Sequence, residues 1–226
     1  MHLITRIPKA GSTSLGVIIR MRGSCAYHLG GSLLSSYGPN EPDQMPCRII
    51  GSITQYGIRR SRSAVVVRNP FARVVSFVFD KGLDWTDDPT CEQPDPEPLT
   101  KERAQHKVRQ ALLMYATFRA SGWTATDLFN DEGVWQPSTT DFRMWHLAPA
   151  MIPEFAVLDH SFIGRLERFP VDYRNAMKVL GVRREHRIPL RRQTKHDHYS
   201  VYYTKETRAI AEEIYAEDCS ELGYTY

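Results

Sequence analysis

Two stretches of this sequence carry residues of the right types and spacing to bind anions. In the first, near the N-terminus, a lysine, a glycine and three hydroxyl residues stand between a short apolar run and an apolar stretch of helical period: Lys9, Gly11, Ser12, Thr13 and Ser14. A strand, a glycine- and hydroxyl-rich turn and a helix in this order are typical of phosphate binding, because backbone N–H groups at a helix start lack internal partners. We therefore predict an anion-binding loop here. The alternative is a capped helix after a tight turn, with Lys9 in solvent.

The second stretch, "SAVVVRNP" from Ser63 to Pro70, contains the clearest strand of the sequence. Its continuous apolar run predicts a strand buried on both faces, and its proline predicts the first turn of a helix. Arg68 follows the valines, and an arginine can bind a phosphate through two parallel hydrogen bonds. Ser76, two turns into the helix, can point the same way. The alternatives are an ion pair at the core edge for Arg68 and a hydroxyl bonded to its own backbone for Ser76.

The first loop differs from the usual nucleotide-triphosphate loop. That motif places lysine directly after its second glycine, whereas Lys9 precedes the only glycine of this loop. An ATP or GTP hydrolase also needs a magnesium-binding carboxylate at the end of a later strand, and the strongest later strand ends in Arg68-Asn69 instead. The pair of stretches therefore predicts two anionic groups bound without a metal. A kinase with a variant phosphate loop remains an alternative.

Strands alternate with helices along the chain, which predicts an α/β fold with a mostly parallel, P-loop-like sheet flanked by helices. The expected strands lie at 2–7, 25–29, 47–53, 63–67 and within 154–167. The expected helices lie at 12–22, 70–81, 101–120, 171–180 and 204–224. We expect a single domain over residues 1–226, with a proline-rich and acidic surface insertion near 84–100.

Composition limits the classes of function. The net charge of +3 suits an anionic ligand, but the basic stretch at 183–198 has few interleaved aromatic residues, so nucleic acid is not expected as a partner. The four cysteines are scattered, which favours reduced thiols over a zinc site. No apolar run approaches the roughly 18 residues of a membrane span, and the first residues predict a strand rather than a leader. These features predict a cytoplasmic enzyme of bacterial or viral type, unless the chain is cut from a longer, anchored Golgi protein.

The two stretches together resemble a known family. "PKAGSTS" and "VVVRNPFARVVSFVFDKG" resemble the two cofactor signatures of the sulfotransferases, and the likeness is closest to the carbohydrate O-sulfotransferase branch, sulfotransferase family 2. The segment "HSFIGRLERFPVDYRNAMKVLG" and the ending "YYTKETRAIAEEIYAEDCSELGY" resemble later segments of that branch. The four segments follow the family order and cover nearly the whole chain, and they imply a sulfotransferase fold.

The resemblance implies the cofactor 3′-phosphoadenosine 5′-phosphosulfate (PAPS), its product 3′-phosphoadenosine 5′-phosphate (PAP), and no metal. The matching positions for the 5′-phosphosulfate are Pro8, Lys9, Ala10, Gly11, Ser12, Thr13 and Ser14. Arg68 and Ser76 match the positions that bind the 3′-phosphate, and Lys195 is a further candidate contact. Sulfuryl transfer depends on positioning and on stabilising charge, so we expect Lys9 to act catalytically on the departing 5′-phosphate.

The general base departs from the family pattern. Relatives of this branch place a catalytic histidine after the third strand, where this chain has Ser52, and a serine is a poor base at neutral pH. His28, at the end of the second expected strand, is the candidate substitute, although a lone histidine is more often structural. His146 could face the substrate or pack in the core, His106 is expected in solvent, and Glu167 is expected to form an ion pair that shapes the site.

The resemblance predicts an enzyme that transfers a sulfuryl group from PAPS to a hydroxyl of a carbohydrate, either a glycan or a glycolipid. A catalytically inactive relative that binds glycan or nucleotide is a further alternative, favoured by Ser52. The basic stretch could cover the nucleotide, receive an acidic glycan or lie in solvent. Aromatic faces suit sugar rings, but tryptophans also anchor cores, and the sequence leaves both readings open for Trp85, Trp123, Trp135 and Trp145.

Overall fold

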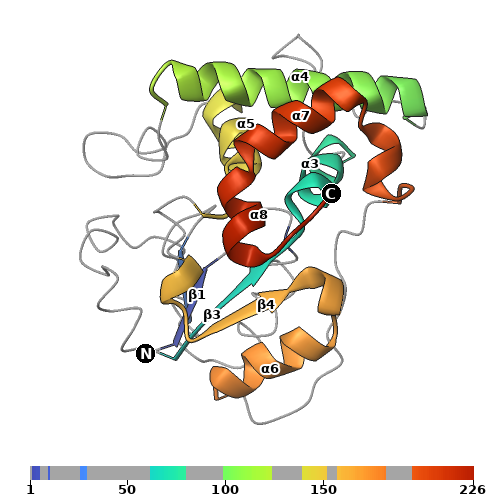
Figure 1. The fold of residues 1–226 in the computed structure, drawn as a ribbon. Coiled ribbons are helices and arrows are strands. Elements are labelled where there is room, and N and C mark those ends of the chain that lie inside the picture. Colours follow the sequence, from blue (N-terminus) through green and yellow to red (C-terminus); the bar gives the residue numbers. More distant parts are fainter. Residues whose placement is uncertain are drawn as a thin grey trace.

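The computed structural model describes residues 2–5, 10, 26–29, 62–79, 99–123, 139–151, 157–181 and 195–226. Within these ranges, one parallel sheet has the strand order β2-β1-β3-β4. Its strands are β1 (His2–Thr5), β2 (Ala26–Leu29), β3 (Arg62–Val67) and β4 (Phe162–Arg165). The α/β prediction with a parallel sheet is thereby confirmed (Figure 1). The expected strand at 47–53, the expected helix at 12–22 and the acidic insertion lie outside the described residues.

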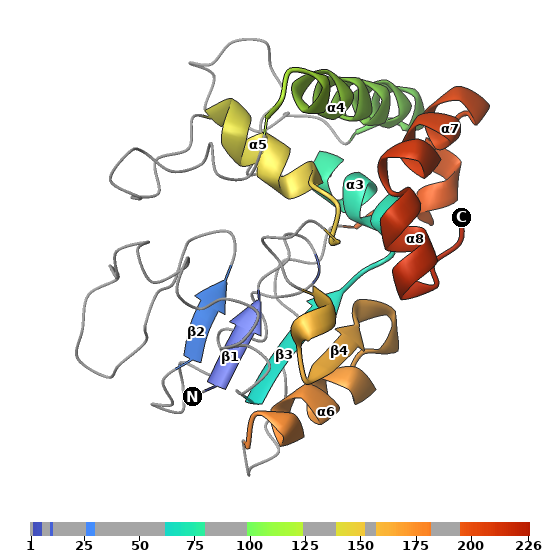
Figure 2. The ribbon, with the colours of Figure 1, turned by 60° about the vertical axis from the view of Figure 1, so that its left-hand side comes forward.

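The strand register brings the carboxyl ends of the strands to one edge of the sheet. Thr5, the last residue of β1, pairs with Leu29 of β2 on one side and with Val65 of β3 on the other. The chain runs from β1 outward to β2, and later from β3 outward to β4, so the connection reverses direction between β1 and β3 (Figure 2). In open parallel sheets such a switch point is where ligands bind, outside the carboxyl ends of the strands.

Strand β3 is buried on both faces, as its valine run predicts. Val65 and Val67 pack with Trp145, Ala150 and Leu222 on one face. Ala64 and Val66 pack on the other face with Tyr173 and its neighbours from helix α6 (Val171–Val179). Because side chains alternate along a strand, two separate apolar clusters flank one strand of six residues.

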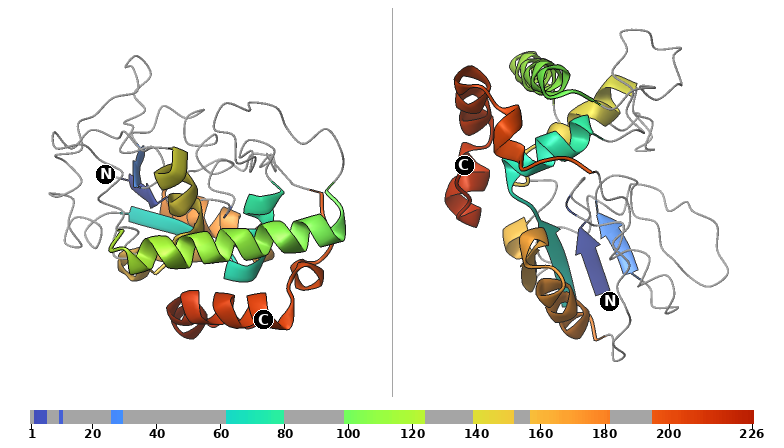
Figure 3. Two further views of the ribbon diagram at one scale, coloured as in Figure 1. Left: turned by 90° about the horizontal axis from the view of Figure 1, so that it is seen from above. Right: turned by 90° about the vertical axis from the view of Figure 1, so that its right-hand side faces the viewer.

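The other helices gather beyond the carboxyl ends of the strands (Figures 1 and 2). They are α3 (Pro70–Val78), α4 (Lys101–Ala120), α5 (Thr139–Leu147), α7 (Lys205–Ile214) and α8 (Ala216–Leu222). A third apolar cluster lies inside this group and includes Phe71, Phe77, Leu112 and Tyr215. Helix α7 packs along α4 (Figure 3). The described segments also contain short 3₁₀ helices: η4 (Val157–Asp159), η5 (Leu166–Arg168) and η6 (Tyr199–Tyr202).

Local sequence signals set several helix boundaries. Helix α4 spans the predicted residues 101–120, and the Thr100 hydroxyl accepts a hydrogen bond from the Arg103 amide at its start. Pro70 occupies the first turn of α3, as predicted. The described helix ends at Val78, and residues 80–98 lie outside the described part of the chain.

The prediction of one continuous helix over 204–224 is wrong. The structure has two helices, α7 and α8, with a break at Tyr215, whose φ of −106° and ψ of 21° are not helical. The Tyr215 hydroxyl donates a hydrogen bond of 2.7 Å to the Leu147 carbonyl, and the tyrosine is fully buried. Tertiary contacts of Tyr215 therefore accompany the break. Gly223 ends α8 in the left-handed conformation with φ 64°, which suits a glycine.

No described helix is long and apolar enough to cross a membrane. The described residues also contain no group of three or more histidine, cysteine and acidic side chains that could hold a metal ion.

Candidate functional site

Arg68 lies directly after β3, at the carboxyl edge of the sheet and beside the switch point. Its side chain is partly exposed. Burial lowers the pKa of its guanidinium; the Glu167 carboxylate opposes this effect, and the positive charge of Arg73 adds to it. A cation that is partly desolvated and lies near a second cation gains much from binding an anion.

Asn69 caps helix α3 with its own side chain. Its Oδ1 accepts hydrogen bonds from the Phe71 and Ala72 amides at 3.0 and 3.2 Å, and its carbonyl accepts from the Arg73 amide. Pro70 has no N–H group. The first amides of α3 are thus already bonded inside the protein, which leaves the start of α3 without free N–H groups for an anion.

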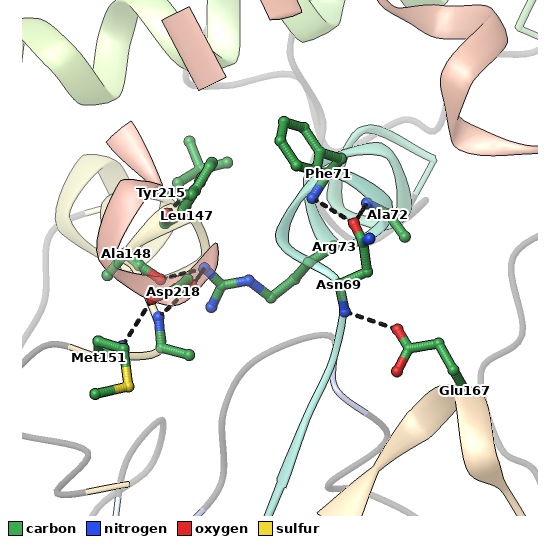
Figure 4. A network of polar contacts seen from close by, with 11 residues as sticks. Asn69, Phe71, Ala72, Arg73, Leu147, Ala148, Met151, Glu167, Tyr215 and Asp218 are labelled. Carbon is green, nitrogen blue, oxygen red and sulfur yellow. Dashed lines mark hydrogen bonds and ion pairs between the residues drawn. The ribbon is translucent and has the colours of Figure 1, made fainter. Parts of the chain in front are cut away.

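Glu167, in η5, bonds the residue that follows Arg68. One of its carboxylate oxygens accepts a hydrogen bond of 2.7 Å from the Asn69 amide, as Figure 4 shows. The other oxygen accepts a hydrogen bond of 3.2 Å from the Tyr224 hydroxyl. The sequence predicts that Glu167 shapes the site through an ion pair. The charge of Glu167 acts on Arg68, and its two oxygens accept hydrogen bonds from the Asn69 amide and the Tyr224 hydroxyl.

Arg73 extends from α3 into the interior and approaches Asp218 of α8 (Figure 4). Arg73 and Asp218 are each 1% exposed, and the guanidinium and carboxylate are 3.8 Å apart. Arg73 also donates to the Ala148 carbonyl, while Asp218 accepts from the Ala150 and Met151 amides at 2.8 and 2.9 Å. The pair therefore joins three segments: the helix behind Arg68, the turn after α5 and helix α8.

Removing the two charges of this pair from water costs free energy. Burial raises the pKa of the Asp218 carboxyl, although Arg73 and the two amides act to lower it. Desolvation thus outweighs the attraction of the partner charge, and such a pair adds less to stability than to the geometry of the segments that it joins.

The predicted 5′ loop is represented in the described residues by Ala10 alone. Ala10 is fully buried in a turn and packs in the apolar cluster of Val65, Val67 and Ala150, on one face of β3. Pro8, Lys9, Gly11, Ser12, Thr13 and Ser14 lie outside the described residues, as does Ser52. The loop begins after β1, which borders the switch point on the side opposite Arg68.

The other predicted site residues are distributed around this edge. His28 lies in β2 opposite Ile4 of β1, one residue before the carboxyl end of its strand. Ser76 is buried within α3, 6% exposed. Lys195 is exposed, close in sequence to the start of η6. The roles of Ser76 and Lys195 in binding an anion stay predictions.

Several aromatic and histidine candidates pack in the core. Trp145 is 3% exposed and belongs to the cluster on one face of β3. Trp123 is partly buried, and its ring centroid lies 6.4 Å from that of Tyr115. The ring centroids of His146 and Phe77 are 5.9 Å apart. His106 is exposed on α4, as expected. For these two tryptophans and for His146, packing is therefore the better interpretation.

Sequence reasoning missed the Arg73–Asp218 pair and the role of Asn69. A signal for the pair was present, because Arg73 interrupts the apolar run "FARVVSFVF", and a charged residue among apolar neighbours indicates a buried partner. Asn69 before Pro70 is likewise a typical helix cap. The identity of the partner, Asp218, requires the fold, because 145 positions separate the two residues in sequence.

One comparison with known proteins identifies a family. Residues 3–225 match the model of a family described as the sulfotransferase family. No curated protein and no solved structure gives a significant match to this chain.

Proposed function

The chain belongs to the sulfotransferase family, and on this premise we propose that it transfers a sulfuryl group from PAPS to a hydroxyl of a carbohydrate acceptor. The observation that carries the proposal is the position of Arg68 beside the switch point of a parallel sheet, next to the strand after which the predicted phosphate loop begins. Two anion-binding elements after neighbouring strands suit a donor that carries one phosphate on the 3′ and one on the 5′ position of its ribose.

The described residues fit a phosphate at this position. Arg68 is a partly exposed cation whose pKa is lowered by burial, and an incoming phosphate would offset that cost. The caps on the first amides of α3 leave recognition to the side chain. We assign Arg68 and Ser76 to the 3′-phosphate of the donor, with Lys195 as a further contact.

We assign the 5′-phosphosulfate of the donor to the loop that follows β1. In this proposal Pro8, Ala10 and Gly11 shape the turn, the hydroxyls of Ser12, Thr13 and Ser14 donate to the anionic oxygens, and Lys9 stabilises the charge that develops on the departing 5′-phosphate. The donor supplies the sulfuryl group. Removing the charge of Lys9 should lower kcat more than it weakens PAP binding, and equal losses in both would contradict this role.

His28 is the proposed base that accepts the proton of the acceptor hydroxyl. Its strand pairs with β1, and His28 lies opposite Ile4, one residue before the end of the strand from which the phosphate loop continues. Replacing His28 by Gln should lower kcat with little change in PAP affinity, and the pH profile of kcat should lose its acidic limb. An unchanged profile would assign the base elsewhere.

The first experiment is a calorimetric titration with PAP, ADP and ATP, each with and without magnesium. We expect PAP to bind without magnesium and more tightly than ADP, which lacks the 3′-phosphate. The preference should fall by about 10- to 100-fold in Arg68→Ala, because a charge-assisted contact to phosphate is lost. Arg109→Ala is the matched control, since Arg109 is exposed on α4 and pairs with Glu206.

The other outcomes separate the alternatives. Magnesium-dependent ATP binding without regard to the 3′-phosphate would indicate a kinase with a variant loop. Binding of PAP with no sulfuryl transfer to any carbohydrate in a labelled-donor assay would favour an inactive binding protein. Transfer to a hydroxyl of another acceptor class would retain the donor site and replace only the carbohydrate.

A further inference from the structure

The last residues of the chain contact the motif that contains Arg68. The Asn69 side-chain amide donates a hydrogen bond of 3.1 Å to the Thr225 carbonyl. The Asn69 backbone amide donates to Glu167, and Glu167 in turn accepts from the Tyr224 hydroxyl. Asn69, which follows Arg68, is therefore linked to the C-terminal residues twice: directly to Thr225, and through Glu167 to Tyr224.

Tyr224 is itself firmly positioned. It is 8% exposed, and the guanidinium carbon of Arg165 lies 4.9 Å from the centre of its ring. Arg165 also donates to the Leu222 carbonyl, at the end of α8. A stacked arginine that is also bonded to the neighbouring backbone limits the motion of the ring, so the hydroxyl has a defined position next to Glu167.

Glu167 differs from an ordinary surface carboxylate. Its side chain is exposed, yet its two oxygens bond the Asn69 amide and the Tyr224 hydroxyl, and its charge acts on Arg68. Exposed charges contribute little to the stability of a fold. A residue with these contacts is therefore better placed to orient Arg68 than to stabilise the protein as a whole.

We propose that Tyr224 and Glu167 are positioning residues for the 3′-phosphate site: Tyr224 fixes Glu167, and Glu167 fixes the backbone and charge environment of Arg68. The proposal rests on the proposed function, because it concerns the same donor site. It assigns to the C-terminal residues a specific part in donor selectivity, the preference for a nucleotide with a 3′-phosphate, and neither residue needs to touch the donor.

The test compares two tyrosine variants and two ligands. Tyr224→Phe removes only the hydroxyl that Glu167 accepts from, whereas Tyr226→Phe removes a hydroxyl that donates to the Ser200 carbonyl. Calorimetry with PAP and with adenosine 5′-phosphate isolates the contribution of the 3′-phosphate. We expect Tyr224→Phe to weaken PAP binding about 3- to 10-fold, which is less than the loss of a direct charged contact because the hydroxyl acts on Arg68 only through Glu167, and to leave the binding of adenosine 5′-phosphate unchanged. Tyr226→Phe should change neither.

A double-variant cycle shows whether the effect passes through Arg68. In the Arg68→Ala background, Tyr224→Phe should cause no further loss of PAP affinity. Glu167→Ala should weaken PAP at least as much as Tyr224→Phe, and the two together should weaken it no more than Glu167→Ala alone.

The results distinguish this inference from the function on which it rests. Equal losses for both ligands, or an undiminished effect in the Arg68→Ala background, would mean that Tyr224 is merely structural and would overturn the inference. An unaltered PAP affinity in both Tyr224→Phe and Glu167→Ala would do the same. A wild-type protein with no preference for PAP over adenosine 5′-phosphate would instead refute the proposed donor site, and the inference with it.

Discussion

Replacement of Asp218 gives the most informative test of how helix α8 and the turn after α5 are joined to helix α3, the helix that follows Arg68. Asp218→Ala leaves the Arg73 guanidinium buried at 1% exposure without its carboxylate, and removes the acceptor of the Ala150 and Met151 amides. Breaking a buried pair by removing one partner costs about 3–5 kcal/mol. In a chain of this length, that loss corresponds to a drop in Tm of roughly 6–20 °C.

Thermal and urea unfolding, followed by circular dichroism, measure the change in the free energy of unfolding. Asp218→Asn is a milder second variant, because its carbonyl oxygen can still accept from one of the two amides, and we expect about 2–3 kcal/mol for it. Glu217→Ala is the control. Glu217 precedes Asp218 in α8 but is exposed, so its replacement should change stability by no more than about 0.5 kcal/mol.

The double variant Arg73→Met, Asp218→Asn tests the cause of the loss. If the cost arises from an unpaired buried charge, the double variant should be more stable than the sum of the single effects predicts, by at least about 1 kcal/mol. Additive effects, or an Asp218→Ala protein as stable as Glu217→Ala, would refute the reasoning from the buried pair.

Three further outcomes are expected. Burial raises the pKa of Tyr203 and Tyr215 far above the usual value of about 10, so their contribution to stability is complete below that pH and is lost progressively as pH rises from there toward the raised pKa of the folded state. In an alkaline titration their tyrosinate absorbance should therefore appear only together with loss of the circular dichroism signal, and ionisation of an intact fold would contradict this. Gly164→Ala should lower the free energy of unfolding by about 1–3 kcal/mol, since a Cβ there would lie 2.9 Å from the Phe162 ring, whereas Gly122→Ala meets no atom within 4 Å and should suffer only from its positive φ; urea midpoints compare the two. Thr204→Ala should cost about 1 kcal/mol, because Thr204 caps α7 by bonding the Thr207 amide, and a loss below a few tenths would show the cap to be unimportant.

The elements with strong local signals could be predicted from the sequence. The valine run of β3 is buried on both faces, Pro70 begins α3, and the apolar period from Lys101 to Ala120 forms α4. The resemblance of the motifs to a sulfotransferase is borne out by the family match. These features depend on short stretches, where hydrophobic period, proline and capping residues determine the local conformation without help from distant residues.

The break at Tyr215 could not be predicted from the sequence, because the apolar period of residues 204–224 suits one continuous helix. The contacts of Tyr215 with Leu147 and Arg73 belong to segments 68 and more positions away. The order of the strands in the sheet could not be predicted either, because the residues of one strand do not specify which other strand it pairs with.

The sequence by itself determined which residue types are available to bind an anion: the lysine and hydroxyl residues of the first loop, and the arginine after the third described strand. The tertiary structure decided how Arg68 is surrounded. It brought Glu167, with its partner Tyr224, to the backbone amide of Asn69, and it paired Arg73 with Asp218. In sequence, Asn69 and Glu167 are 98 positions apart, and Arg73 and Asp218 are 145 positions apart. Local propensity cannot encode such partners, because their energies exist only after strands and helices have packed and water has been excluded around them.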